Sequence, residues 1–142
     1  MTIEYSREMR LPHVAILCVA LAIAGCSGAS GRPPLADVAL PNVSRLDPSV
    51  QTQITQGHAT LTRTRESADA SDAEVGAAYG EFGVLLHAAG FLEGADAAYA
   101  NAQALLPVDA RWPYYRALVA RARGNAPQAV TCLLYTSPSP RD

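Results

Sequence analysis

Apolar residues recur at steps of three and four through the middle of the chain, which is the spacing of one face of an α-helix. In the first such stretch, Ile54 and Leu61 fall on the same face. Asp47 followed by Pro48 is typical of a helix N-cap and a first helical position. We therefore predict a first helical segment, residues 47–70, with an amphipathic helix that starts at the proline.

The next stretch carries the signals of a helical hairpin. Ser71 and Glu74 have the S-x-x-E spacing of a capping box, in which each side chain accepts a hydrogen bond from the other residue's backbone N–H. Gly90 supplies a turn, because glycine adopts a left-handed conformation at little cost. A second helix is expected over 92–106, and Pro107 stops it. The residues expected to pack between the two helices are Val75, Tyr79, Phe82, Leu85 and Leu86, then Ala95, Ala98, Tyr99, Ala102 and Leu106.

This hairpin resembles the tetratricopeptide repeat, a 34-residue helix–turn–helix with the pattern W-x₂-L-G-x₂-Y, then A-x₃-F, then P. Residues of the same or similar bulk stand at the matching positions, without insertion: Tyr79, Phe82, Gly83, Leu86, Ala95, Tyr99, Ala102 and Pro107. The resemblance implies an all-α fold of antiparallel helix hairpins stacked as an α-solenoid, with residues 71–109 as one repeat. Small residues at Gly83 and Ala95 are expected where the two helices cross. An ordinary hairpin of a helix bundle is the alternative.

A second, partial repeat is expected over residues 110–131. One repeat length of 34 residues after Gly83, Gly90 and Ala95, the chain has Ala117, Gly124 and Ala129. At the helix start the register stays open, because Pro113 and Arg116 take the positions of Tyr79 and Phe82. The second helix of this unit is expected to start near Ala126 and to be cut off within a turn.

The C-terminal segment, residues 132–142, reads CLLYTSPSPRD. It resembles the translation of a transposase mosaic end joined to a sequencing adapter, and Pro138 and Pro140 forbid the helix that the repeat would place there. We expect the segment to be an adapter-derived artefact and the natural protein to continue with further repeats. A natural polar C-terminus is the alternative.

The N-terminus resembles a bacterial lipoprotein signal peptide, residues 1–26. The apolar run Val14–Ala24 follows Arg7 and Arg10 and is too short to cross a bilayer as a mature helix. The sequence that ends at Cys26 resembles a lipobox, which implies cleavage before this cysteine and lipidation of its thiol. Ser27, which is not Asp, favours the outer membrane, facing the periplasm. A plain signal peptide or a buried apolar helix is the alternative, and residues 27–46, which mix Gly, Ser and Pro, are predicted to be a flexible tether.

Composition and charge mainly argue against certain classes of function. The sequence is 49% hydrophobic and 17% charged, which fits a globular chain. A formal net charge of −2, without a basic stripe, gives no reason to expect a nucleic-acid partner. The three cysteines and three histidines are scattered and show no metal-ligand or nucleophile motif. We therefore expect no enzyme activity, no cofactor and no metal.

The tetratricopeptide resemblance implies a groove that binds a protein or peptide partner and is lined by the first helix of each repeat. Carried over residue by residue, the candidates are Gly80, Glu81, Val84, His87 and Ala88, then Arg111, Tyr114, Leu118 and Arg121. The Lys/Asn carboxylate clamp of chaperone-binding members is absent, because Gly80 and Val84 stand at its positions. We expect a lipid-anchored envelope scaffold. The alternatives are an accessory repeat domain of a longer periplasmic enzyme or electron-transfer protein, and a structural lipoprotein without a groove function.

Overall fold

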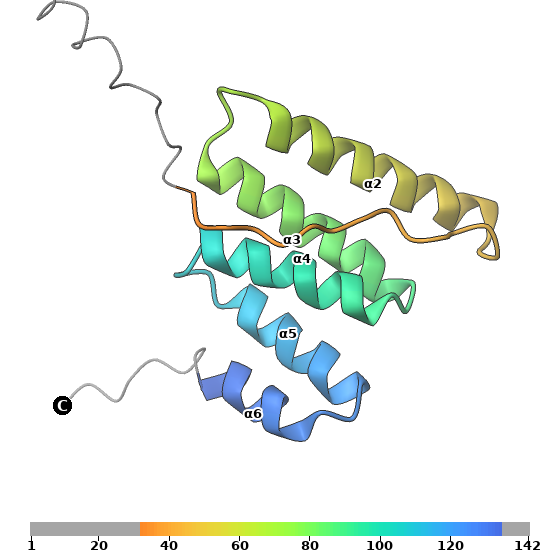
Figure 1. The fold of residues 1–142 in the computed structure, drawn as a ribbon. Coiled ribbons are helices and arrows are strands. Elements are labelled where there is room, and N and C mark those ends of the chain that lie inside the picture. The colour runs from red at the N-terminus through yellow and green to blue at the C-terminus, as the bar shows by residue number, and fades with distance from the viewer. Residues whose placement is uncertain (1–31, 135–142) are drawn as a thin grey trace, which may run out of the picture. The chain divides into compact units, whose positions relative to one another are not determined.

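The computed structural model of the chain describes residues 32–134, and in that range every regular element is a helix. The all-α prediction is therefore confirmed for the described part. The signal peptide with Cys26, the start of the tether and most of the C-terminal segment lie outside it. The helices are α2 (Pro48–Glu66), α3 (Asp72–Ala88), α4 (Leu92–Leu105), α5 (Arg111–Ala122) and α6 (Ala126–Leu134), and consecutive helices run antiparallel (Figure 1).

The starts of the first two described helices follow their predicted caps. The Asp47 side chain accepts a hydrogen bond from the backbone N–H of Ser49 at 2.8 Å. At the start of α3 the backbone N–H of Glu74 donates to the Ser71 hydroxyl at 3.2 Å, and the backbone N–H of Ser71 donates to the Glu74 carboxylate at 2.8 Å. This reciprocal pair is the predicted capping box, and it satisfies N–H groups that have no partner inside the helix.

The turns after α3 and α5 have the same geometry. Gly90 and Gly124 have φ angles of 82° and 74°, which glycine adopts without strain. Each turn has the two hydrogen bonds of a Schellman motif. They run from Phe91 N to Leu86 O and from Gly90 N to His87 O in the first turn, and from Asn125 N to Ala120 O and from Gly124 N to Arg121 O in the second. Two hairpins of this chain therefore close in the same way, with glycines one predicted repeat apart.

Helices α3 and α4 pack closely because one of the two lacks a side chain at the crossing. A Cβ atom added at Gly83 would lie 2.8 Å from the Tyr99 ring and 3.3 Å from Ala98 Cβ. The sequence predicts small residues at Gly83 and Ala95 where the two helices cross. Gly83 lies against Tyr99 and Ala98 of α4, and Ala95 is fully buried in the same helix.

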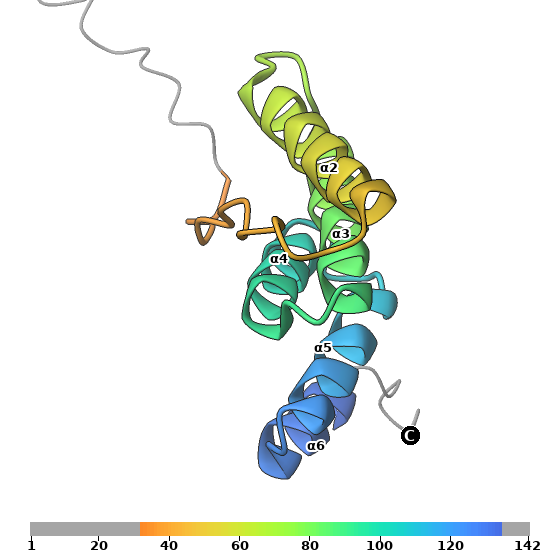
Figure 2. The same ribbon diagram turned by 90° about the vertical axis from the view of Figure 1, so that its right-hand side faces the viewer.

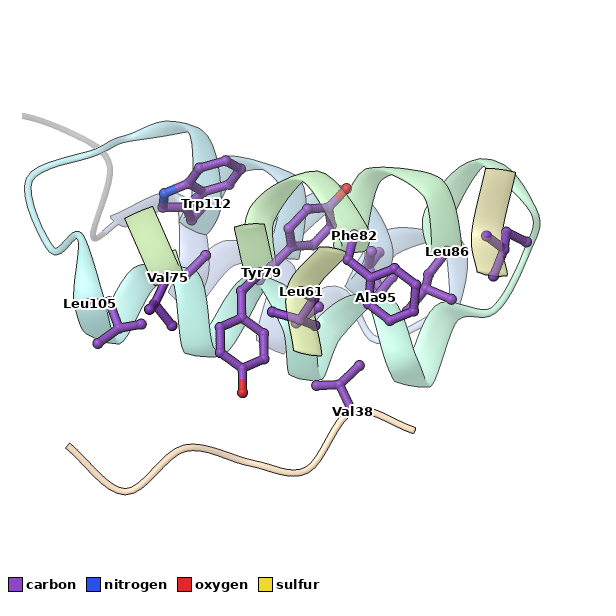
Figure 3. Packing of buried hydrophobic residues seen from close by; sticks show 14 residues of the cluster. Val38, Leu61, Val75, Tyr79, Phe82, Leu86, Ala95, Leu105 and Trp112 are labelled. Carbon is purple, nitrogen blue, oxygen red and sulfur yellow. The ribbon is translucent and has the colours of Figure 1, made fainter. Parts of the chain in front are cut away.

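The residues expected to pack between the two helices form the centre of the hydrophobic core (Figure 3). The family positions Tyr79, Phe82, Leu86, Ala95, Tyr99 and Ala102 are all buried, and Gly83 is buried among them, whereas Pro107 is exposed in the turn after α4. Helix α2 adds Ile54 and Leu61 to the same core, so α2, α3 and α4 share one apolar interior.

Helix α5 joins this core through Trp112. The repeat pattern did not assign a position to this side chain, because the register at the start of the second repeat stayed open. Trp112 is buried, and its ring covers Gly80 of α3. Arg116, which occupies the position of Phe82 one repeat later, donates from Nε to Asp96 Oδ1 at 2.9 Å and from Nη1 to Gln103 at 3.1 Å. At the repeat position where the first hairpin has Phe82, the second therefore has the Arg116–Asp96 ion pair. The apolar contact of α5 with the core comes from Trp112 instead.

Residues 32–46 form an extended segment that we call the strap (Figures 1 and 2). The prediction of a flexible tether is wrong for this part, because the strap packs against the helices before α2 begins. Val38 is only 5% exposed and points from the strap toward Leu61 (Figure 3). Apolar residues among the prolines of the strap, namely Leu35, Val38, Val43 and Leu46, contribute to the core and explain the docking.

Helix α6 is longer than the single turn that the sequence predicts, with nine residues. Its last three residues, from Cys132 to Leu134, belong to the segment predicted to be an adapter artefact. Cysteine and leucine are compatible with a helix, and Cys132 is buried with 8% exposure. The prolines that forbid a helix come later, outside the described residues.

Candidate functional site

A groove of about 350 Å³ lies between α3 and α5, with a wall from α4. Four of the predicted groove residues line it, Val84, His87, Ala88 and Leu118, and two further residues, Tyr99 and Tyr115, complete it. Val84 is 43% exposed. The groove is therefore mainly apolar and aromatic and open to solvent.

Stacked aromatic rings form one side of the groove. The rings of Tyr99 and Tyr115 stack with centroids 5.3 Å apart and planes at 28°, and Trp112 stacks behind Tyr99 at 6.2 Å. His87 meets Tyr99 edge-on at 6.1 Å. Such pairs hold aromatic side chains in a fixed arrangement, so this wall is preorganised for contact with another apolar group.

Burial raises the pKa of the Tyr99 phenol, and the nearby Tyr115 phenol raises it further. Tyr99 is consequently neutral throughout the physiological pH range and does not bring a charge into the groove. A neutral phenol can donate one hydrogen bond and accept others. The Tyr99 ring therefore contributes an uncharged, buried surface behind the groove.

Charged residues lie outside the apolar wall. Arg111 donates from Nη2 to Asp109 Oδ2 at 2.7 Å, and this hydrogen bond is the main cause that lowers the pKa of the Asp109 carboxyl and raises that of the guanidinium. Glu81 adds to the raised pKa of Arg111. The Arg111 guanidinium also lies 4.6 Å from the centroid of the Trp112 ring, a cation–π geometry. The Arg111 guanidinium is thus already engaged by Asp109 and Trp112.

The two remaining candidates on α5 are freer. Tyr114 is 48% exposed, and its ring lies 5.8 Å from that of Tyr115. Arg121 is exposed in the last turn of α5, and within residues 32–134 it has no acidic partner. A side chain with a solvated guanidinium and one with a half-exposed ring are the groups through which a bound peptide gains most.

The structure therefore brings some of the predicted site residues together and separates others. Val84 and His87 lie in the groove, whereas Glu81, Arg111, Tyr114 and Arg121 do not line it. Gly80 is buried under Trp112 and has no access to the groove. Tyr115 is not among the predicted groove residues, although it stands one repeat length of 34 residues after Glu81. Tyr99 is predicted as a packing residue, and its ring, 1% exposed, also borders the groove.

Outside the groove, the described part of the chain has one further histidine. His58 lies on α2 and meets Phe82 edge-on at 5.5 Å, far in the sequence from the groove residues. Within residues 32–134, His, Cys, Asp and Glu side chains form no cluster that could hold a metal ion. In the same range, the helices lack the combination of length and apolar composition that a bilayer crossing requires.

In comparisons with known proteins, no protein-family model, no curated protein and no solved structure matches this chain.

Proposed function

We propose that the chain is a lipid-anchored envelope protein whose stacked, tetratricopeptide-like hairpins bind a protein or peptide partner. The observation that carries the proposal is the solvent-open aromatic groove between α3 and α5, with Val84 and Tyr114 exposed beside it. The identical Schellman turns at Gly90 and Gly124 support the repeat character. The proposal assigns binding to this groove, and no catalysis.

The chemistry of the groove indicates what its partner carries. A bulky apolar side chain of the partner would contact Val84 and the Tyr99–Tyr115 stack, because apolar area removed from water is the main source of affinity there. An acidic group next to that side chain would approach Arg121, whose guanidinium has no acidic partner in the described part of the chain. Guanidinium–carboxylate hydrogen bonds are among the strongest that proteins make.

The groove is tested with a library of displayed peptides panned against the full chain in detergent, followed by calorimetric titration of the selected peptides. We expect the pair Arg121→Glu and Tyr114→Ala to weaken their binding at least about tenfold, which corresponds to loss of about 1.4 kcal/mol. Ala104→Asp, an exposed position of α4 outside the groove, is the matched control and is expected to leave affinity unchanged. Equal affinity of both variants would refute the groove assignment.

The anchor is a separate part of the proposal. Cys26 is its lipidation site, and in the sequence residues 27–31 lie between it and Arg32, the first residue of the strap. Several acyl chains on one residue give stable anchoring, because each buried CH₂ adds about 0.8 kcal/mol. The proposed address is the outer membrane, on its periplasmic side.

Lipidation is tested by expression in a Gram-negative host with globomycin, which blocks lipoprotein signal cleavage. We expect a larger precursor to accumulate, and Cys26→Ala to give that precursor without the inhibitor. A product whose size does not respond to globomycin would remove the lipoprotein assignment while leaving the groove assignment standing.

A further inference from the structure

The strap is held at its centre by a buried side-chain amide. Asn101 of α4, 3% exposed, accepts a hydrogen bond at Oδ1 from the Ala36 backbone N–H at 2.9 Å and donates from Nδ2 to the Ala36 carbonyl at 2.8 Å. The side-chain amide of Asn101 therefore pairs with both backbone polar groups of Ala36. This contact recognises an extended main chain, and it does not depend on the side chain at that position.

Charged contacts flank this centre. Arg32 donates from Nε to the Asp72 carboxylate at 2.6 Å and also to the Ala70 carbonyl, both at the start of α3. Further along the strap, Asp37 lies 3.9 Å from Arg65 of α2. We call the surface under the strap, which runs from Asp72 at the start of α3 past Asn101 of α4 to Arg65 of α2, the furrow between α2 and α4. It therefore offers an acidic group near the start of the strap and a basic group further along.

The strap fills this furrow incompletely. A pocket of about 460 Å³ opens between the strap and the end of α3 and start of α4, where Leu86, Phe91 and Ala97 line it. A second pocket, of about 330 Å³, opens between the strap and Leu61 of α2. Both are bordered by Val38 and Ala39, whose small side chains leave the space open. Larger apolar side chains at these positions would bury more area than the strap does.

We propose that the furrow between α2 and α4 is a second peptide site, that the strap occupies it in cis, and that an extended segment of a partner protein replaces the strap. The segment has an Arg at its first position, a main chain free to pair with Asn101 at its fifth, an acidic residue at its sixth and a bulky apolar residue at its seventh. This site is independent of the groove between α3 and α5, since the two share no lining residue.

Exchange of the strap requires only local opening. In the strap, Val38 alone is buried, and Leu35, Val43 and Leu46 are only partly buried against the core. Segments with few buried contacts open at much lower free energy than the whole domain. A tethered strap competes with a free peptide at an effective concentration that reaches the millimolar range for short linkers, so a partner needs the larger side chains that the pockets accept.

The test is calorimetric titration of the full chain with the synthetic peptide RPPLADVALP, the sequence of residues 32–41. Arg32→Glu with Val38→Asp in the chain releases the strap without altering the furrow. We expect this variant to bind the peptide at least about tenfold more tightly than the unaltered chain, because the competitor is gone. Adding Asn101→Leu is expected to abolish binding, and Tyr114→Ala, on α5 and outside the furrow, is expected to leave it unchanged. A folded strap-released variant that does not bind the peptide would overturn the proposal.

A measurement on the unaltered chain covers the case in which strap release unfolds the protein. Amide hydrogen exchange compares the Ala36 N–H with the Tyr79 N–H in the core helix α3. We expect the Ala36 amide to exchange at least about tenfold faster, since it is freed by local opening. Equal rates would mean that the strap leaves only when the domain unfolds, and the proposal would then be rejected whatever the peptide titration gives.

Discussion

At the residue scale, the clearest feature is a glycine that leaves room for a ring. A Cβ atom at Gly80 would overlap the six-membered ring of Trp112, which is itself buried and stacked on Tyr99. Gly57 also lies within a helix, but the atom nearest to its added Cβ is Leu85 Cδ1, the end of a flexible side chain. Both glycines are therefore helical, but Gly80 faces a buried ring and Gly57 faces the end of a flexible side chain.

We predict that Gly80→Ala destabilises the protein by about 1–3 kcal/mol, the usual cost of overpacking a filled core. This cost exceeds the gain of about 1 kcal/mol that alanine normally brings to a helix interior. Gly57→Ala is expected to be close to neutral, because Leu85 can rotate away. Urea unfolding followed by circular dichroism measures both free energies. A stabilised Gly80→Ala protein would mean that Trp112 does not pack on α3.

The same residues show what a sequence can predict about a site. The repeat spacing predicts that Val84, His87 and Leu118 face one side of their helices, where they line the groove between α3 and α5, because side-chain direction follows helical periodicity. It also gives Gly80 as a groove candidate, but the indole of Trp112 covers Gly80, and the pattern left the register of Trp112 open. Whether a small residue faces a ligand or another ring depends on packing between elements, which periodicity does not contain.

At the scale of elements, the helix starts are determined locally and were predictable, as α3 shows. The Ser71 hydroxyl is the main cause that lowers the pKa of the Glu74 carboxyl, and the Ser71 backbone N–H adds to it. A lowered pKa means that the contribution of Glu74 to stability is present above its unfolded pKa and is lost as pH falls through the folded value.

We predict that Ser71→Ala lowers the free energy of unfolding by about 1 kcal/mol at neutral pH, the typical cost of losing an N-cap. The difference from the unaltered protein should shrink as the pH falls below the ordinary carboxyl range, since the protonated Glu74 no longer gains from the cap. Denaturant titrations across this range measure it, with Ser67→Ala, at the exposed end of α2, as control. A difference that stays constant with pH would contradict the role of Glu74.

The strap, by contrast, was not predictable as an element. Its Pro-rich sequence has no periodicity, so composition alone suggested a flexible tether. What holds it is Asn101, which is 65 positions away from Ala36 in the sequence.

At the scale of the whole described unit, stability is unevenly distributed. One core connects the strap with α2, α3, α4 and α5, whereas α6 buries Cys132 alone, which is not part of that core cluster. The described helices pack mainly against their neighbours in the sequence. In such an arrangement each helix depends on the adjacent one, so the last described helix is expected to open first.

We predict that the Cys132 thiol reacts with iodoacetamide faster than global unfolding allows, because opening of α6 exposes it while the core stays folded. Mass spectrometry of the peptide that contains Cys132 follows the reaction. Val38→Ala, which weakens the opposite end of the core, is expected to leave this rate unchanged. A rate equal to that of global unfolding would show that α6 belongs to the same cooperative unit as the core.

The position of Trp112 gives the protein a built-in optical probe. It is the only tryptophan in the sequence, and its buried indole lies where α5 meets Gly80 of α3 and Tyr99 of α4. Its intrinsic fluorescence therefore reports mainly on the packing of α5 against α3 and α4. Comparison of this emission with the helical signal separates the release of α5 from the melting of the remaining helices.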